Sequence, residues 1–163
     1  MAKTVEISDL DRSFMSEAIR LASESAASGG GPFGAVIVRD GRIVASGSNS
    51  VTRDADPTAH AEVNAIRLAC RMLGTHDLSG CTLYTSCEPC PMCLGAIYWA
   101  HIDRIFCGST REDAADAGFY DHFIYEEMNV PAEERSIPLT PLMRDEALES
   151  FRIWSANEDK KEY

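Results

Sequence analysis

The first part of the chain has apolar residues at helical spacing, followed by two short apolar runs that suit strands. Over residues 9–27 the apolar side chains recur three and four positions apart, which predicts an amphipathic helix capped by Ser8 or Asp9. Glycines and a proline in 29–34 end this helix. Residues 35–47 have the order strand, Asp-Gly turn, strand, which predicts a β-hairpin. The apolar positions of the helix are Leu10, Phe14, Ala18, Leu21, Ala22 and Ala26.

The middle of the chain continues the alternation of helix and strand. Residues 58–73 predict a second helix, with Pro57 in its first turn and Gly74 at its C-terminal cap. Short apolar runs at 81–85 and 104–108 predict two further strands. The buried stripe of the second helix is expected to be Val63, Ile66, Cys70 and Leu73.

Helical patterns dominate the remainder of the chain. Residues 87–100 turn at their prolines and continue as a third helix, and 123–128 and 144–157 also have helical patterns. The polar residues 158–163 have the composition of a frayed tail. The alternation predicts an α/β domain with helices on the faces of a central sheet. No linker divides it, so we expect one domain over residues 1–163.

Charge and hydropathy narrow the class of protein. The 163 residues carry a net charge of −11, and the Lys and Arg residues are scattered singly or in pairs. Such a field repels phosphate backbones, so we expect a small neutral or cationic substrate and no nucleic acid partner. The N-terminus lacks the apolar core of a signal peptide, and no apolar run reaches membrane-spanning length. We therefore expect a cytoplasmic protein with no membrane partner.

The closely spaced cysteines indicate a metal site, because cytoplasmic cysteines stay reduced. Cys90 and Cys93 lie three positions apart at a helix start, where the helix dipole lowers the pKa of a thiol. His60 also lies near a predicted helix start. If the two helix starts meet beside the sheet, these side chains supply three zinc ligands, one short of a tetrahedral set. The fourth position would hold water or hydroxide, as in catalytic zinc sites.

The stretch His60-Ala61-Glu62 places a carboxylate two positions from the expected histidine ligand. Residues two apart on a regular helix point to nearly opposite sides, so Glu62 is not expected to be a co-ligand. We expect it to contact the zinc-bound water as a proton shuttle. A His-x-Glu motif combined with Pro-Cys-x-x-Cys is typical of zinc-dependent deaminases.

Other interpretations of the cysteines stay open at this point. Cys87, Cys90 and Cys93 could hold an iron–sulfur cluster, although the run lacks the further Cys-Pro that such clusters use. Cys87 could also complete a closed structural zinc site, which would leave Glu62 without a purpose. We favour Cys87 as a bystander near the site. A zinc-stabilised binding module without chemistry is the alternative from another class, and the intact Glu62 argues against it.

At the level of longer motifs, the chain resembles the zinc-dependent cytidine-deaminase-like superfamily, and within it the small bacterial guanine deaminases. The resemblance covers essentially the whole chain, in "GGPFGAVIV", "DPTAHAEV", "LYTSCEPCPMCLGAIYWA", "DAADAGFYD", "PAEERSIP" and "KKEY". It implies a three-layer α/β/α fold with a central mixed sheet of about five strands. The activity it implies is hydrolytic deamination of guanine to xanthine and ammonia, in purine catabolism or salvage.

The resemblance also implies roles for polar residues in the site. Glu62 would take the proton of the water, pass it to a ring nitrogen and later help to protonate the departing amine. Asp121 would contact the substrate and assist proton transfer. Asn49 would hydrogen-bond the purine edge, and the backbone N–H of Ala61 would touch the base. Without the resemblance, Asn49 could be a loop cap and Asp121 a solvated loop carboxylate.

Aromatic residues are expected to close the site. Phe33 would be a stacking wall, although core packing explains it nearly as well, and Trp99 would help to exclude water. The resemblance implies that Tyr163 closes an active site, in this chain or in a partner subunit. The family forms homodimers, some with exchanged C-terminal segments, so residues from about 130 to 163 would complete the site of the partner.

Two related activities compete with guanine deamination. A tRNA adenosine deaminase shares both zinc motifs but needs a basic surface to hold RNA, and the net charge of −11 argues against it. Deamination of guanosine, cytosine or an amino-triazine differs only at the edge of the pocket. The sequence separates these substrates poorly.

Overall fold

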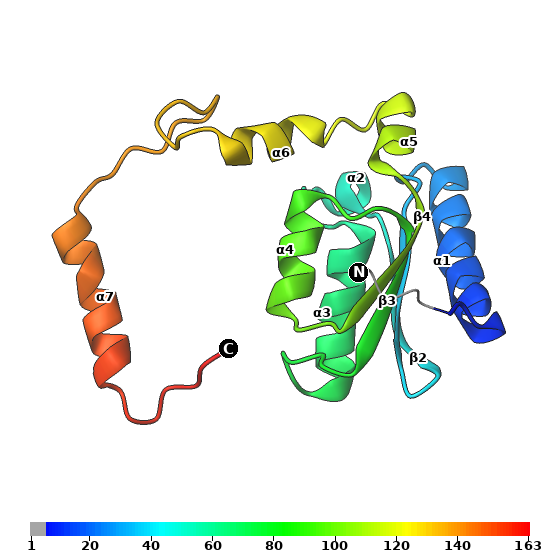
Figure 1. The fold of residues 1–163 in the computed structure, drawn as a ribbon, viewed down its shortest axis with the longest axis horizontal. Coiled ribbons are helices and arrows are strands. Elements are labelled where there is room, and N and C mark those ends of the chain that lie inside the picture. Colours follow the sequence, from blue (N-terminus) through cyan, green and yellow to red (C-terminus); the bar gives the residue numbers. More distant parts are fainter. Residues whose placement is uncertain (1–5) are drawn as a thin grey trace. The chain divides into compact units, whose positions relative to one another are not determined.

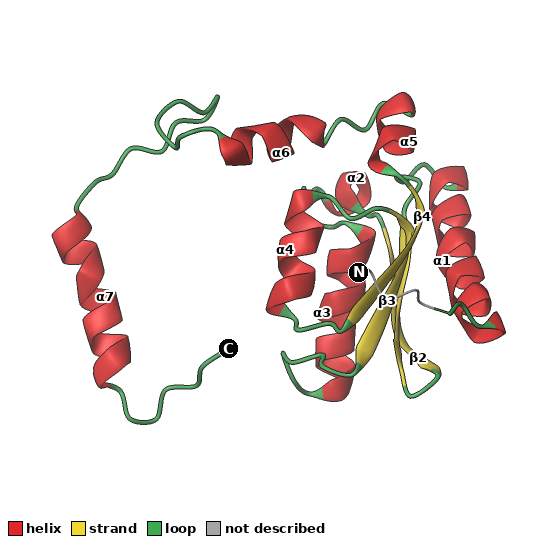
Figure 2. Ribbon diagram, in the orientation of Figure 1, coloured by secondary structure: helices red, strands yellow, loops and turns green. Residues whose placement is uncertain are grey.

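The computed structural model describes residues 6–163, and its helices and strands follow the alternating order predicted from the sequence (Figure 2). Residues 1–5, part of the stretch considered above for a signal peptide, lie outside the described residues. No helix among the described residues is long and apolar enough to cross a membrane. The elements of the first 121 residues are α1 (Asp9–Ala27), β1 (Gly34–Arg39), β2 (Arg42–Ser48), α2 (Val51–Asp54), α3 (Ala61–Leu73), β3 (Cys81–Cys87), α4 (Pro91–Trp99), β4 (Arg104–Ser109) and α5 (Arg111–Asp116).

The sheet is mixed and has the strand order β2-β1-β3-β4. The strand β1 is antiparallel to β2 and β3, and β3 is parallel to β4. The sheet therefore has four strands within the described residues, where about five were expected. The count was too high because the chain enters α5 after β4 and forms no further strand among the described residues.

Helices cover both faces of this sheet, which confirms the three-layer architecture. The helix α1 lies on one face, and α3 and α4 lie on the other (Figure 1). Alternate residues of β1 serve the two faces, as the period of a strand requires. Ala35 and Ile37 belong to the apolar cluster with α3, whereas Val36 and Val38 belong to the cluster with Ala18 of α1.

Chain turns and close contacts fix where α3 begins. The Asp40-Gly41 turn joins β1 to β2 with positive φ angles of 51° and 71°, which confirms the predicted hairpin. Further along β2, Gly47 lets α3 approach closely: a Cβ there would lie 2.5 Å from the carbonyl oxygen of Ala61. Asn64 adds a polar tie by donating to the carbonyl oxygen of Ser48 at 2.9 Å. The first turn of α3 is thus held against the end of β2.

The second helix begins three residues later than predicted, at Ala61 instead of residue 58. Thr58 is held in a turn, because its N–H and its hydroxyl both donate to the carboxylate of Asp56, at 2.8 and 2.7 Å. Pro57 therefore lies before the helix and not in its first turn. His60 becomes the N-cap, with extended backbone at φ −73° and ψ 156°. The C-terminal cap at Gly74, with φ 67°, is as predicted.

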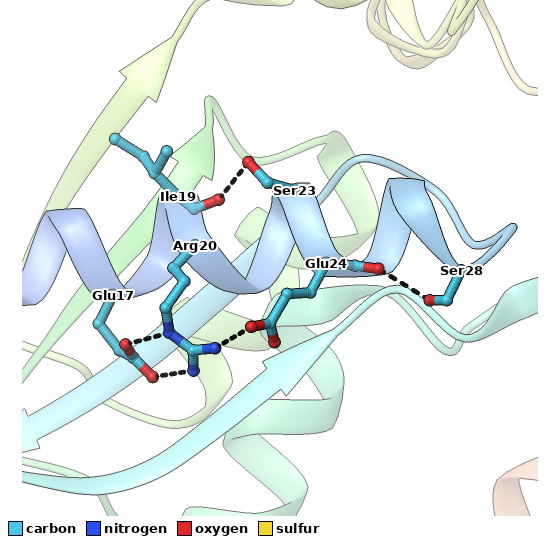
Figure 3. Close-up of polar contacts among 6 residues, drawn as sticks. All are labelled: Glu17, Ile19, Arg20, Ser23, Glu24 and Ser28. Carbon is cyan, nitrogen blue, oxygen red and sulfur yellow. Dashed lines mark hydrogen bonds and ion pairs between the residues drawn. The ribbon is translucent and has the colours of Figure 1, made fainter.

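The helix α1 shows the predicted cap and a charged outer face. The hydroxyl of Ser8 accepts the N–H of Asp11 at 3.1 Å, so Ser8 is the cap. On the outer face Arg20 pairs with Glu17 and with Glu24 (Figure 3). Half of the Arg20 side chain is exposed, so solvent screens these pairs and they contribute little to stability.

The chain divides into two compact units, Met1–Asp121 and His122–Tyr163. The sheet and its covering helices lie in the first unit. The second unit contains α6 (His122–Asn129) and α7 (Arg144–Ala156), close to the two helices predicted there, and neither contains a buried residue. A single domain over all 163 residues stays a prediction.

Candidate metal centre and active site

Three soft or borderline donors meet where two helices begin. His60 is the N-cap of α3 and Cys90 is the N-cap of α4, and Cys93 lies in the first turn of α4. The Nδ1 atom of His60 lies 3.5 Å from the Sγ atom of Cys90 and 3.5 Å from that of Cys93. All three donor atoms lie within 4.8 Å of one another. The structure thus brings the three predicted ligands together.

The spacing of these donors fits zinc. With Zn–S of about 2.3 Å and Zn–N of about 2.0 Å, tetrahedral ligand atoms lie roughly 3.5 Å apart. A hydrogen bond from Cys93, reinforced by His60, lowers the pKa of Cys90 to about 4, and the same hydrogen bond raises the pKa of Cys93. The lowered pKa favours the thiolate form of Cys90, and a bound cation would favour the thiolate of Cys93 as well.

Cys87 is not part of this cluster among the described residues. Its thiol lies 3.4 Å from the carbonyl oxygen of Thr110 and is buried. This contact supports the interpretation of Cys87 as a neighbour of the site. With three ligands, the arrangement leaves the open position that distinguishes a catalytic zinc from a closed structural one.

Glu62 is a buried carboxylate beside the three donors, and only 6% of it is exposed. Its Oε2 atom lies 3.4 Å from the Sγ atom of Cys93, and its Oε1 atom lies 3.2 Å from the hydroxyl of Thr85. Burial raises the pKa of Glu62 above its ordinary value. Because His60 precedes the helix, the regular-helix geometry used to separate the two side chains does not apply. Glu62 nevertheless stays outside the ligand cluster.

Three residues expected to contact the substrate lie in the same unit. The N–H of Asn49 donates to the carbonyl oxygen of Phe33 at 3.0 Å, and the Asn49 side chain accepts the N–H of Val51 at 3.3 Å. That second bond is the loop cap considered above, although Asn49 retains further hydrogen-bonding capacity. Phe33 packs edge-on against Phe119 at 4.9 Å. Burial, and then the negative charge of Cys90, raise the pKa of Asp121. This carboxyl group therefore lies within electrostatic range of the ligand cluster.

The other predicted residues have different positions. Ala61 is fully buried as the first residue of α3. Trp99 lies at the opposite end of α4 from Cys90 and is 66% exposed, and its expected role in excluding water stays a prediction. Tyr163 lies in the second unit, and its role stays a prediction.

Three further residues around the site were not predicted from the sequence. Thr85 supports Glu62 from β3, and Glu88 and Arg111 form an ion pair at 2.6 Å just beyond the metal ligands. The only available signal was the position of Thr85 in the strand before the cysteines. The pairing of Glu88 with Arg111 depends on the parallel pairing of β3 and β4, which local patterns do not reveal.

Helix starts that present one histidine and two cysteines, with a buried glutamate that is not a ligand, are typical of zinc-dependent nucleobase deaminases. The chain belongs to the cytidine and deoxycytidylate deaminase family, because the model of that family's zinc-binding region matches residues 8–109. Zinc is therefore its cofactor, and His60, Cys90 and Cys93 are the residues that could hold it.

Several relatives resemble the chain over most of its length. The guanine deaminase of Bacillus subtilis is 56% identical over 92% of this chain and 97% of its own length. A crystal structure of guanine deaminase from that organism covers 93% of this chain and 98% of its own, with a TM-score of 0.91. A guanine deaminase from Nitrosomonas europaea is 32% identical over 94% of this chain and 87% of its own, with a TM-score of 0.66. The tRNA-specific adenosine deaminase of Bacillus subtilis is 37% identical over 72% of this chain and 73% of its own length.

Proposed function

We propose that this chain hydrolyses guanine: guanine and water give xanthine and ammonia. The observation that carries the chemistry is the buried Glu62 beside the His60, Cys90 and Cys93 cluster. The match to the guanine deaminase of Bacillus subtilis supports the choice of substrate, since it covers 92% of this chain.

The site separates the tasks of binding metal and moving protons. When bound, zinc supplies Lewis acidity, which makes water nucleophilic near neutral pH. Glu62 takes the proton of the attacking water, delivers it to a ring nitrogen and then assists departure of the amine. Thr85 limits the orientations of the Glu62 carboxyl group through the contact at Oε1. Burial keeps bulk water from competing for that proton.

The substrate would contact residues contributed by several elements. Asn49 would hydrogen-bond the purine edge with the amide capacity left over from the loop cap. The N–H of Ala61 would touch the base, and Phe33 would form an aromatic wall, held by Phe119. Asp121 would accept or donate a proton at the exocyclic amine, a role that its raised pKa supports.

We also propose that the chain acts as a cytoplasmic homodimer in which the C-terminal segment, including Tyr163, completes the site of the partner. The helices α6 and α7 support this proposal because neither contains a buried residue. Helices of 8 and 13 residues gain most of their stability from packing an apolar face, so a further surface is needed to cover them. Tyr163→Ala should then reduce guanine turnover, and mixing it with an active-site variant should restore part of the activity.

A tRNA adenosine deaminase is the second candidate, favoured by the similarity to the enzyme of Bacillus subtilis. It needs a surface that attracts phosphates, and the net charge of −11 opposes this. Guanosine, cytosine and amino-triazines are closer competitors.

The deciding experiment measures ammonia release by the zinc-replete protein from guanine, guanosine, adenine, cytosine and an amino-triazine, each supplied separately, and inosine formation in tRNA. Release from guanine with at most trace release from the others is the expected result. Release mainly from another ring would keep the zinc chemistry and overturn the substrate. Inosine formation without guanine turnover would favour a tRNA adenosine deaminase. No reaction with any of these substrates would favour a binding module.

A further inference from the structure

The loop that carries the metal ligand Cys90 is tied to the start of the segment that carries Asp121. The N–H of Glu88 donates to the carbonyl oxygen of Ser109 at 2.9 Å. In return, the Glu88 carboxylate accepts the guanidinium of Arg111 at 2.6 Å and the backbone N–H of Arg111 at 3.2 Å. One carboxylate therefore holds both the side chain and the backbone of Arg111.

The same segment is anchored again at its other end. After Arg111 it forms α5, whose N-cap Thr110 and Asp113 bond each other reciprocally in a capping box. It then reaches Phe119, whose ring packs edge-on against Phe33. Asp121 follows two residues later. The segment from Arg111 to Phe119 is thus held at both ends, by Glu88 in the loop before Cys90 and by Phe33 just before β1.

The contact between Glu88 and Arg111 is less exposed to solvent than the other ion pairs among the described residues. The two side chains are 29% and 33% exposed, whereas Arg20 on α1 is 50% exposed. Partial burial reduces solvent screening, and a charged pair that also holds a backbone N–H is geometrically restricted. Arg111 also acts on Asp121: its charge lowers the pKa of that carboxyl group, opposing the effect of burial.

We propose that Arg111, held by Glu88, is a positioning residue that places the Asp121 carboxylate over the metal cluster. This inference rests on the proposed function, in which Asp121 contacts the substrate. Arg111 itself does not touch the substrate. Its role is to make the loop before Cys90 and the segment before Asp121 move as one body, so that the carboxylate and the metal keep a fixed separation.

A double-mutant cycle tests this role through guanine turnover and zinc content. Arg111→Ala should lower kcat/KM roughly tenfold to a hundredfold, mainly in kcat, with zinc per chain unchanged, because misplacing a catalytic group weakens the transition state. In an Asp121→Asn background the same substitution should cost about threefold at most, since both changes then remove one shared function. Arg111→Lys keeps the charge but loses the forked donor geometry, so it should recover only part of the activity.

A control and a second readout separate positioning from general stability. Arg20→Ala removes an arginine that also contacts two carboxylates, but on the outer face of α1 (Figure 3), and it should leave kcat/KM unchanged. Hydrogen exchange should show faster exchange over residues 112–121 in Arg111→Ala, with no change in β3.

Each failure has a distinct signature. Equal losses from Arg111→Ala in both backgrounds, or unchanged activity with faster exchange, would reduce Arg111 to a structural clamp and overturn the positioning role. Unchanged exchange would refute the clamp itself. If the unaltered protein releases no ammonia from guanine, the proposed function is wrong. The double-mutant cycle is then measured with whichever ring the protein deaminates. With no turnover of any ring, the positioning role falls with the function.

Discussion

At the scale of single residues, the site depends on a carboxylate kept out of water but within reach of the metal ligands. Glu62 has one oxygen near Cys93 and the other near Thr85, so its orientation is restricted on both sides. Burial disfavours the charged form of such a group, so its pKa lies above the ordinary value of a glutamate. Proton transfer, and not metal binding, is therefore the function that a substitution here should remove.

We predict that Glu62→Gln lowers kcat on guanine by about 10²- to 10⁴-fold, because glutamine keeps the shape but cannot move the proton. Zinc per chain, measured by elemental analysis, should not change. Glu24→Gln, on the exposed outer face of α1, is the matched control and should retain full activity. Substantial turnover by Glu62→Gln would show that another group moves the proton.

Residues differ in how well the sequence reveals them. Cys90 and Cys93 were predictable because metal-binding cysteines recur at this short spacing, and His60 was predictable from its His-x-Glu motif. Glu88 and Arg111 could not be predicted as a pair. Arginines and glutamates are common residues and are usually solvated, so nothing in the sequence links these two. Their meeting depends on strand pairing, a property of the fold and not of either local sequence.

At the scale of secondary structure, the placement of His60 and Glu62 depends on how closely α3 lies on β2. We predict that Gly47→Ala destabilises the protein by about 1–3 kcal/mol, because the added methyl group would meet the backbone of α3. Zinc affinity should fall as well, since the start of α3 carries a ligand. Denaturant unfolding and zinc titration measure the two effects.

The matched control is Gly95→Ala in α4, where an added Cβ meets nothing within 4 Å. Alanine is favoured over glycine in a helix interior by roughly 0.5–1 kcal/mol, so this variant should be as stable as the unaltered protein or more so. Equal effects of the two substitutions would mean that the close approach of α3 has no special importance.

The attachment of α1 to the sheet should depend on pH. Hydrogen bonds from Ser8, and then from Tyr84, lower the pKa of Asp11 from 3.8 to about 2. A carboxyl group with a lowered folded-state pKa contributes stability above its unfolded pKa and loses it as the pH falls. We predict that the free energy of unfolding decreases between about pH 4 and pH 2, and that Asp11→Asn flattens this decrease.

Urea unfolding at several pH values measures the effect, and Tyr84→Phe provides an intermediate case. This variant removes the donor that bonds Asp11 at 2.5 Å but leaves the bonds from Ser8. Its slope should therefore lie between those of the unaltered protein and Asp11→Asn. If the free energy of unfolding falls equally steeply with pH in the unaltered protein and both variants, other groups cause the acid sensitivity.

The ends of helices and strands were predictable where no side-chain turn competed with the local sequence signal. The Asp-Gly turn and Gly74 identified the hairpin and the end of α3 correctly. The start of α3 was misplaced because Asp56 captures the Thr58 N–H and hydroxyl, a side-chain turn that competes with helix formation. The strand count was too high because it came from the resemblance and not from this chain's own pattern.

At the scale of the whole molecule, the fold and the metal centre should be separable. None of the three candidate ligands belongs to either buried apolar cluster. We predict that chelation abolishes turnover, preserves most of the far-UV circular dichroism and lowers Tm, because a ligand that binds only the folded state stabilises it. Added zinc should restore activity. Loss of the dichroism signal on chelation would indicate a structural metal.

The hairpin turn at Asp40-Gly41 offers a practical consequence. Both residues are exposed, and the turn closes the end of β1 opposite to Phe33 and Asn49. The six residues of β1 span about 20 Å, so an attachment at the turn stays well away from the zinc cluster. Anchoring the protein there to an electrode or a bead would leave the reacting end facing the solution, which is the orientation that a guanine sensor reporting released ammonia requires.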